Sequence, residues 1–127
     1  MASELRVNTL KDASGNNSVA MSTVAEGSAK AWLNADHTSN SISSSFNYSS
    51  FTDINLGDST LAFTSSMSGA STAYSLNGMA TNNIASTETW SRFYNITASG
   101  YSVRRGYETT TEFDWSSCMD QVHGDLA

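Results

Sequence analysis

The residue types best suited to catalysis are scarce in this chain of 127 residues, which holds two histidines and one cysteine. Nucleophilic catalysis needs a nucleophile beside a base, and a third group that orients the base. His37 falls in an expected turn and His123 lies close to the last residue, and neither accompanies a recognisable nucleophile motif. Because serine is abundant, some Ser/His/Asp combination arises by chance. The sequence therefore predicts no catalytic triad, and we expect a protein that is not an enzyme.

Metal ligands are also sparse. Cys118, Asp120 and His123 fall within six residues, but on a strand positions 118 and 120 share a face and position 123 does not, so an edge strand with a polar end is favoured over a zinc site. Asp53 and Asp58 lie in Asn-rich turns without an EF-hand pattern, although calcium remains an alternative. We predict no metal and no cofactor. Cys118 is expected to be a small buried hydrophobe, with a reactive or interchain thiol as the alternative.

One acidic cluster, formed by Glu108, Glu112 and Asp114, follows Arg104 and Arg105 closely. Glycosidases use two carboxylates about 5–10 Å apart across a cleft. A β-hairpin with ion pairs between its strands accounts for the same residues without a cleft, and this interpretation is favoured.

Aromatic side chains are concentrated in the second half of the chain. Exposed aromatic rings can stack on sugars or anchor an interface, whereas strand alternation places part of such a set in a core. We expect an even division between core and surface, and the tyrosines Tyr94, Tyr101 and Tyr107 are the candidates for surface recognition. The full set is Trp90, Phe93, Tyr94, Tyr101, Tyr107, Phe113 and Trp115.

Length and composition indicate one folded domain. Hydrophobic residues make up 39% and charged residues 14%, both below the globular average, because Ser, Thr and Asn together make up roughly two residues in five. The 10% of aromatic residues argue against disorder. A net charge of −6 with few adjacent basic residues argues against a nucleic-acid partner. No apolar run approaches the roughly 20 residues of a membrane span, and no secretory h-region is seen near the start, so we expect a soluble protein made in a cytoplasm.

The elements that must position these residues are predicted to be short strands. Proline is absent, and turns are indicated by clusters of Gly, Asn, Asp and Ser, as at residues 12–17 and 57–58. Phe46 and Tyr48 share one parity while Phe51 has the other, so a bulge or turn is expected between Tyr48 and Phe51. No window keeps helical apolar spacing. We predict an all-β, antiparallel, jelly-roll-like sandwich, with strands in residues 4–10, 29–33, 42–54, 60–64, 73–76, 89–96, 100–103, 112–115 and 118–122.

Residues 1–28 are poorer in large apolar side chains than the rest of the chain, and they are predicted to form an N-terminal arm before a head domain of residues 29–127. The arm has too few apolar side chains to build a core of its own. We therefore expect a partner subunit or another protein of an assembly to cover them. The residues expected to make this contact are Leu5, Val7, Leu10, Val19, Met21 and Val24.

Four phrases of the chain, in order, resemble short tail-fibre-like proteins of bacteriophages, marine and cyanobacterial ones especially. They are LRVNTL with DASG (5–15), GSAKAW (27–32), SFNYSSFTD (45–53), and a Gly-Asp turn leading to a strand that ends in Phe-Thr (57–64). The resemblance covers residues 4 to about 80 and fades beyond. One departure is that Met67 to Tyr74 lacks the proline and aspartate of the family's Met-Pro-Asp-Ala-Asn-Tyr phrase.

This resemblance implies a structural protein of the virion, made in the host cytoplasm and homotrimeric, whose head recognises a glycan or protein of the host surface. Its other partners would be virion proteins. The alternative within the same setting is a capsid decoration or knob protein that binds the shell through residues 1–28, which the small size of the chain favours.

Overall fold

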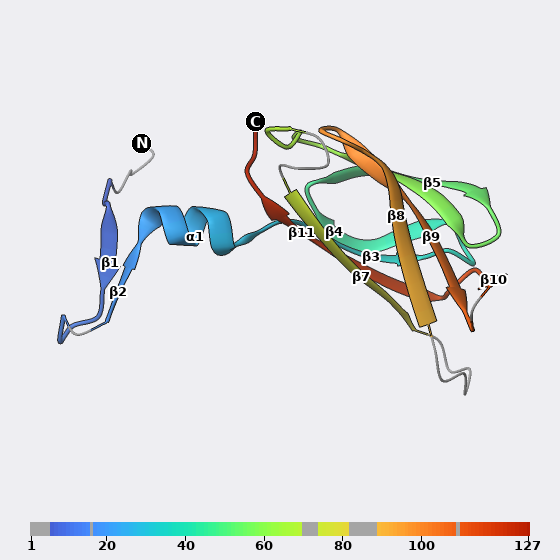
Figure 1. Ribbon diagram of the computed structural model, residues 1–127, viewed down its shortest axis with the longest axis horizontal. Helices are drawn as coiled ribbons and strands as arrows, with labels where there is room; N and C mark the ends of the chain where they lie inside the picture. Colours follow the sequence, from blue (N-terminus) through green and yellow to red (C-terminus); the bar gives the residue numbers. More distant parts are fainter. Residues whose placement is uncertain (1–5, 16, 70–73, 82–88, 109) are drawn as a thin grey trace.

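The computed structural model describes residues 6–15, 17–69, 74–81, 89–108 and 110–127 (Figure 1). Within these ranges all but one of the regular elements are strands, and the exception is the short helix α1. In chain order they are β1 (Thr9–Lys11), β2 (Ser18–Ala20), α1 (Met21–Gly27), β3 (Ala29–Asp36), β4 (Ser41–Phe46), β5 (Tyr48–Asn55), β6 (Asp58–Phe63), β7 (Tyr74–Thr81), β8 (Thr89–Thr97), β9 (Gly100–Tyr107), β10 (Thr111–Glu112) and β11 (Ser117–Gly124). No helix in this described part is long and apolar enough to cross a bilayer.

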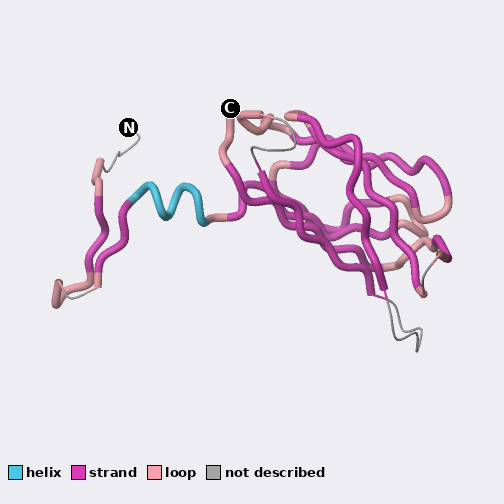
Figure 2. Tube along the Cα trace, in the orientation of Figure 1, coloured by secondary structure: helices cyan, strands magenta, loops and turns pink. Residues whose placement is uncertain are grey.

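Two antiparallel sheets form the body of the molecule (Figure 2). One, the β3 sheet, has the strand order β4-β3-β11-β7. The other, the β9 sheet, places β5, β6, β9 and β8 side by side, and β10 pairs with the end of β9 at Tyr107 and Gly106. Buried side chains of both sheets form one hydrophobic cluster between them. The predicted all-β antiparallel sandwich is confirmed, while its jelly-roll character stays a prediction.

Strand alternation decides which side chains enter this core. In β3, Ala31, Leu33 and Ala35 point inward and are buried, while the residues between them face outward. Leu61 of β6 and Val103 of β9 oppose them from the other sheet. Burying a leucine or phenylalanine side chain contributes roughly 2 kcal/mol, so this cluster is the main source of the sandwich's stability.

Asn47 is the corner where the chain leaves one sheet and enters the other. It lies between β4 and β5 with a φ of 60°, a left-handed conformation that asparagine tolerates. Its side-chain amide donates to the carbonyl oxygens of Lys30 and Ser65, both at 3.1 Å, and its Oδ1 accepts from the Ser65 amide at 2.7 Å. The strand predicted over residues 42–54 is therefore divided at Asn47, while the irregularity predicted between Tyr48 and Phe51 is present as a register shift between Tyr48 and Ser50.

Gly57 makes the second critical turn, between β5 and β6. Its φ is 67°, and an added Cβ would lie 2.7 Å from the Phe113 amide nitrogen and closer still to the Arg105 carbonyl oxygen. Asp114 accepts a hydrogen bond from the Gly57 amide at 2.7 Å. These contacts hold residues 113–116 as a loop, so the strand predicted over residues 112–115 is wrong beyond Glu112.

The arm lies outside the sandwich. Strands β1 and β2 pair as a hairpin, α1 follows, and the chain enters the sandwich at β3 (Figures 1 and 2). The helix was not expected because its seven residues are too short to show helical periodicity in an eleven-residue window. The strand expected over residues 4–10 is limited to Thr9–Lys11 within the described residues.

Candidate interaction surfaces

The apolar side chains predicted to make contacts from the arm are largely exposed. Val7, Leu10 and Val24 are exposed, and Val19 and Met21 are half-buried. Leu5 lies outside the described residues. None of the five belongs to either of the two core clusters. The arm is therefore a peripheral element that keeps apolar surface in contact with water.

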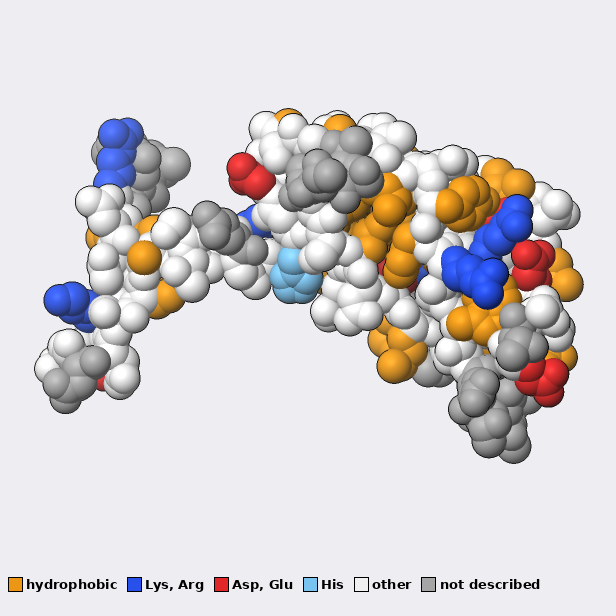
Figure 3. All heavy atoms as spheres, viewed as in Figure 1, with side chains coloured by type: hydrophobic (Ala, Val, Ile, Leu, Met, Phe, Trp, Pro, Cys, Tyr) orange, Lys and Arg blue, Asp and Glu red, His pale blue; other side chains and the backbone are white. Residues whose placement is uncertain are grey.

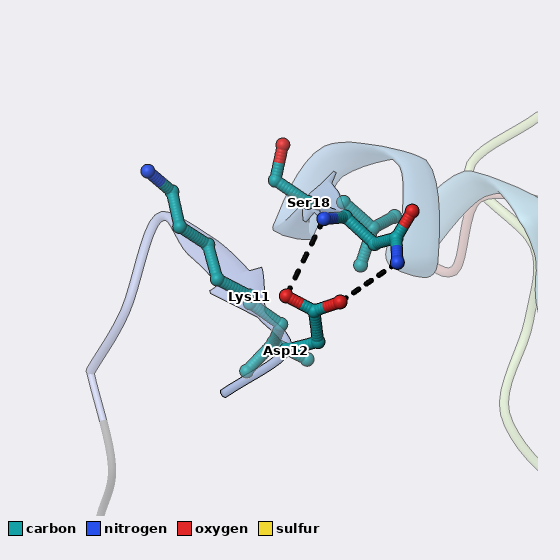
Figure 4. Close-up of a pocket in the computed structure, with 6 residues that line it drawn as sticks. Lys11, Asp12 and Ser18 are labelled. Carbon is teal, nitrogen blue, oxygen red and sulfur yellow. Dashed lines mark hydrogen bonds between the residues drawn. The ribbon is translucent and has the colours of Figure 1, made fainter. Parts of the chain in front are cut away.

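The arm hairpin is closed by its own side chains. Asp12 accepts hydrogen bonds from Asn17 Nδ2 at 2.7 Å and from Ser14 Oγ at 2.9 Å, and these bonds lower the pKa of its carboxyl group. Figure 4 shows the Asp12 carboxylate turned toward the second strand while Lys11 points away from it. A hollow of about 300 Å³, lined in part by Leu10 and Val19, lies at this hairpin. The hairpin thus presents a preformed surface.

The outward face of the β9 sheet carries Tyr94 in a fixed setting. Its hydroxyl donates to Asp58 Oδ1, and Arg104 Nε donates to Asp58 Oδ2 at 3.0 Å. The Arg104 guanidinium also lies 5.4 Å from the centre of the Tyr94 ring. The hydrogen bond to Asp58 raises the pKa of Tyr94. Tyr94 is half-buried, so its ring is partly available at the surface while its hydroxyl is engaged.

Basic and acidic side chains lie together on this part of the surface, over the β9 sheet (Figure 3). Arg92 lies 4.9 Å from the centre of the Trp90 ring. Arg104 Nη1 is 3.7 Å from Glu112 Oε1 across the β9–β10 pair, in line with the favoured interpretation of the acidic cluster as a hairpin with ion pairs. An exposed pair of this kind contributes little to stability.

Tyr101 is a correction, because it belongs to the core and not to the surface. It is 1% exposed, and its ring packs 5.9 Å from that of Phe63. Its hydroxyl lies 2.6 Å from the hydroxyl of Tyr48 and donates to Asp120 Oδ2 at 2.8 Å. Tyr101 lies opposite Leu61 of β6, and the side chains of both residues belong to the core cluster between the sheets. A side chain that is 1% exposed in this place cannot take part in surface recognition.

Asp120 continues this buried polar network. Arg105 forms a salt bridge with Asp120, and the side chains of both residues are fully buried. Arg105 Nη1 lies 2.9 Å from His37 Nε2, and Ser59 Oγ lies 3.3 Å from the same nitrogen. Charged groups in a core are tolerated only when they are paired in this way. The network joins the two sheets across the sandwich.

His37 is a structural residue of this network. It is buried although it occupies the predicted turn, and burial together with Arg105 lowers its pKa to about 4. Since Arg105 donates to Nε2, the imidazole is neutral with its proton on Nδ1, and Nδ1 has no hydrogen-bond partner among the described residues. The pair with Ser59 therefore lacks both an orienting group and access to solvent.

The residues considered for metal binding are separated. Cys118 is buried, as predicted, and burial raises the pKa of its thiol to about 12. Asp120 is engaged by Arg105, and His123 lies near the end of β11, beyond a register shift in the pairing of β11 with β3. Asp53 accepts from Asn40 Nδ2 at 3.1 Å. In the described part of the chain no three His, Cys, Asp or Glu residues are grouped to hold a metal ion.

Tyr107 is half-buried in a second, smaller aromatic cluster. Its ring lies 5.9 Å from Phe113 and 6.4 Å from Trp115. Trp115 is buried, whereas Tyr107 and Phe113 pack against it from the partly exposed side. Of the three predicted recognition tyrosines, Tyr94 and Tyr107 are partly exposed. They lie on opposite faces of the β9 sheet, since Tyr94 is on the outward face and Tyr107 packs in the smaller aromatic cluster.

A surface that sequence reasoning missed lies on the outward face of the β3 sheet. Trp32, Phe46, Met79 and Met119 are all exposed there. Trp32 is paired with Phe46, and Met119 with Met79, on neighbouring strands. The signal was present in residues 31–35, where small or aliphatic side chains alternate with Trp32 and Asn34 and thus place the tryptophan outside.

These features define a class, an all-β sandwich with an extended arm and two exposed apolar surfaces. Comparison with protein-family models, characterised proteins and solved structures finds no match for the chain. The fold and the chemistry of the surfaces are therefore the basis for inferring its function.

Proposed function

We propose that this chain is a structural protein of a bacteriophage particle, a tail-fibre-like or receptor-binding component. The arm attaches the protein to its neighbours, and the sandwich is the head that recognises the host surface. The observation that carries the proposal is the arm, which places Val7, Leu10 and Val24 in water outside the sandwich. Exposed apolar side chains grouped on a protruding element are typical of a surface that is covered in an assembly.

The four phrases that resemble the phage family support the setting. Two of them coincide with structurally demanding positions, since one includes Asn47 and another includes Gly57, both with positive φ. A third runs into β3, the strand that joins the arm to the sandwich. Within the described residues, His37 and Cys118 are buried, and Glu112 is paired with Arg104. A role in assembly and recognition needs none of them.

A second candidate function is decoration of the capsid, with the arm bound to the shell. It is favoured by the short path from arm to head, because β3 begins two residues after α1 ends and leaves no room for a fibre shaft. In both cases we propose a homotrimer whose partners include other virion proteins.

Imaging phage particles that carry a tagged copy of this protein tests the proposal. Label at the tail supports the receptor-binding role, label over the capsid supports decoration, and particles without label overturn both. Purified labelled protein should also bind host cells saturably if the head recognises a receptor. A hydrolase would instead degrade capsular polysaccharide, and that activity would disappear in Glu112→Gln.

A further inference from the structure

The exposed large apolar side chains of the described residues are grouped in two places. Of ten such residues, three lie in the arm and four on the outward face of the β3 sheet. The remaining three are separate from both, two in the β5–β6 turn region and one near the C-terminus. The ten are Val7, Leu10, Val24, Trp32, Phe46, Ile54, Leu56, Met79, Met119 and Leu126.

On the β3 sheet the four apolar residues form one oblique stripe, because the register places Phe46 beside Trp32 and Met119 beside Met79. Uncharged polar residues flank the stripe on both sides, namely Ser44, Asn34, Gln121 and Asn77. None of these four polar side chains has a hydrogen-bond partner in the described protein. A face rich in aromatic residues and Met and free of charge has the composition of the centre of a protein interface. We call these eight residues the stripe face.

The arm offers a matching apolar surface. Leu10 and Val19 are directly opposite each other in the hairpin. Met21 and Val24 are three residues apart in α1 and therefore lie on one side of the helix. The arm of the same chain leaves the sandwich at Ala29 and extends away from it (Figures 1 and 2), so it does not cover its own stripe face.

Charge selects between possible pairings of two copies. Residues 29–127 contain four basic and nine acidic residues, a net charge of −5, whereas residues 1–28 contain two basic and three acidic residues, a net charge of −1. Two sandwiches placed face to face would therefore repel each other more strongly than a sandwich and an arm that carries a net charge of only −1. This difference favours contact between an arm and a sandwich.

We propose that the arm of one copy of this chain packs on the stripe face of a second copy. The contact is heterologous, so each copy gives one arm and accepts another, and a closed ring of copies satisfies every arm and every face. The inference rests on the self-association proposed above and names the surface that it uses.

Complementation between two variants tests the contact. Leu10→Asp with Val24→Asp disables the arm, and Trp32→Glu with Met79→Glu disables the stripe face. Each variant alone should be a monomer by light scattering at micromolar concentration, with a dissociation constant raised about 30-fold or more. An equimolar mixture should form a 1:1 complex of twice the monomer mass, since one intact arm and one intact face remain.

The matched control is Ile54→Asp with Leu56→Asp, which removes apolar side chains exposed by 54% and 56% outside both surfaces. It should assemble as the unchanged chain does. A mixture that stays monomeric while the unchanged chain assembles would overturn the proposal, as would an equal loss of assembly in the control. An unchanged chain that is itself monomeric would also overturn it. Circular dichroism of all variants verifies that the sandwich is folded.

Trp32 provides a second readout, because it is 41% exposed while Trp115 is buried and Trp90 half-buried. In the mixture, the Trp32 of the arm variant should become less accessible to iodide quenching.

Failure of the virion experiments would leave this contact between copies intact. Failure of complementation would leave a virion role in which the arm binds another protein.

Discussion

Leu10 in the arm and Leu33 in the sandwich are both leucines in β-strands, yet Leu10 is 44% exposed and Leu33 is 2% exposed. The β1–β2 hairpin has only a short helix beside it, so no second layer covers its apolar side chains. In the sandwich each sheet covers the other. The difference teaches that strand pairing alone is enough to form the β1–β2 hairpin of the arm. Its apolar side chains can stabilise the protein only when another surface packs against them and removes them from water.

The largest expected effect breaks the network that joins the two sheets. Asp120→Ala leaves the buried Arg105 guanidinium without its carboxylate partner. Breaking a buried pair from one side should lower the free energy of unfolding by about 3–5 kcal/mol, measured by urea denaturation. Replacing both members, with Arg105→Met and Asp120→Leu, should recover much of this loss. An Asp120→Ala protein as stable as the unchanged chain would show that the pair is dispensable.

Acid should weaken the same network through His37. Burial lowers its folded-state pKa to about 4 from an ordinary 6.5, so the unfolded state binds more protons between these values. The contribution of the neutral imidazole is therefore full above pH 6.5 and is lost as the pH falls toward 4, by roughly 3 kcal/mol in total. Urea denaturation at several pH values measures this slope. His37→Asn should flatten it, and an unchanged slope in that variant would assign the pH dependence to other groups.

Gly57→Ala should destabilise the turn that joins β5 and β6. An added Cβ meets backbone atoms of Arg105 and Phe113, and the positive φ is unfavourable for alanine. We expect a loss of about 2 kcal/mol in the free energy of unfolding. Gly27→Ala is the matched control, because nothing lies within 4 Å of its added Cβ, and it should change stability by less than about 0.5 kcal/mol. Equal effects at the two glycines would contradict the steric argument.

The sandwich class and several turns could be predicted from sequence because their signals are local. Gly57 with Asp58 marked a turn by residue type alone, whereas the corner at Asn47 was not predicted, because its side chain is held by Lys30 and Ser65 from other parts of the chain. The polar network could not be predicted, since His37, Arg105 and Asp120 are far apart in sequence and meet only when β9 faces β11 across the core. Tyr101 was placed wrongly for the same reason, because a tyrosine in an alternating strand fits either face until the partners of its hydroxyl are known.

The smallest effect tests the comparison between arm and sandwich directly. Leu10→Ala should change the free energy of unfolding of the monomer by less than about 0.5 kcal/mol, because its side chain is exposed and lies outside both cores. Leu33→Ala, the same substitution in the core, should cost about 2–5 kcal/mol. Thermal unfolding of the two variants below the concentration of assembly measures both values. A large loss for Leu10→Ala under those conditions would mean that the arm is part of the sandwich's stability. If the arm is covered only by a second copy, the loss of stability in Leu10→Ala should be small at low protein concentration and should grow as the concentration rises. Binding to the folded state adds stability by mass action, and the variant would gain less of it than the unchanged chain.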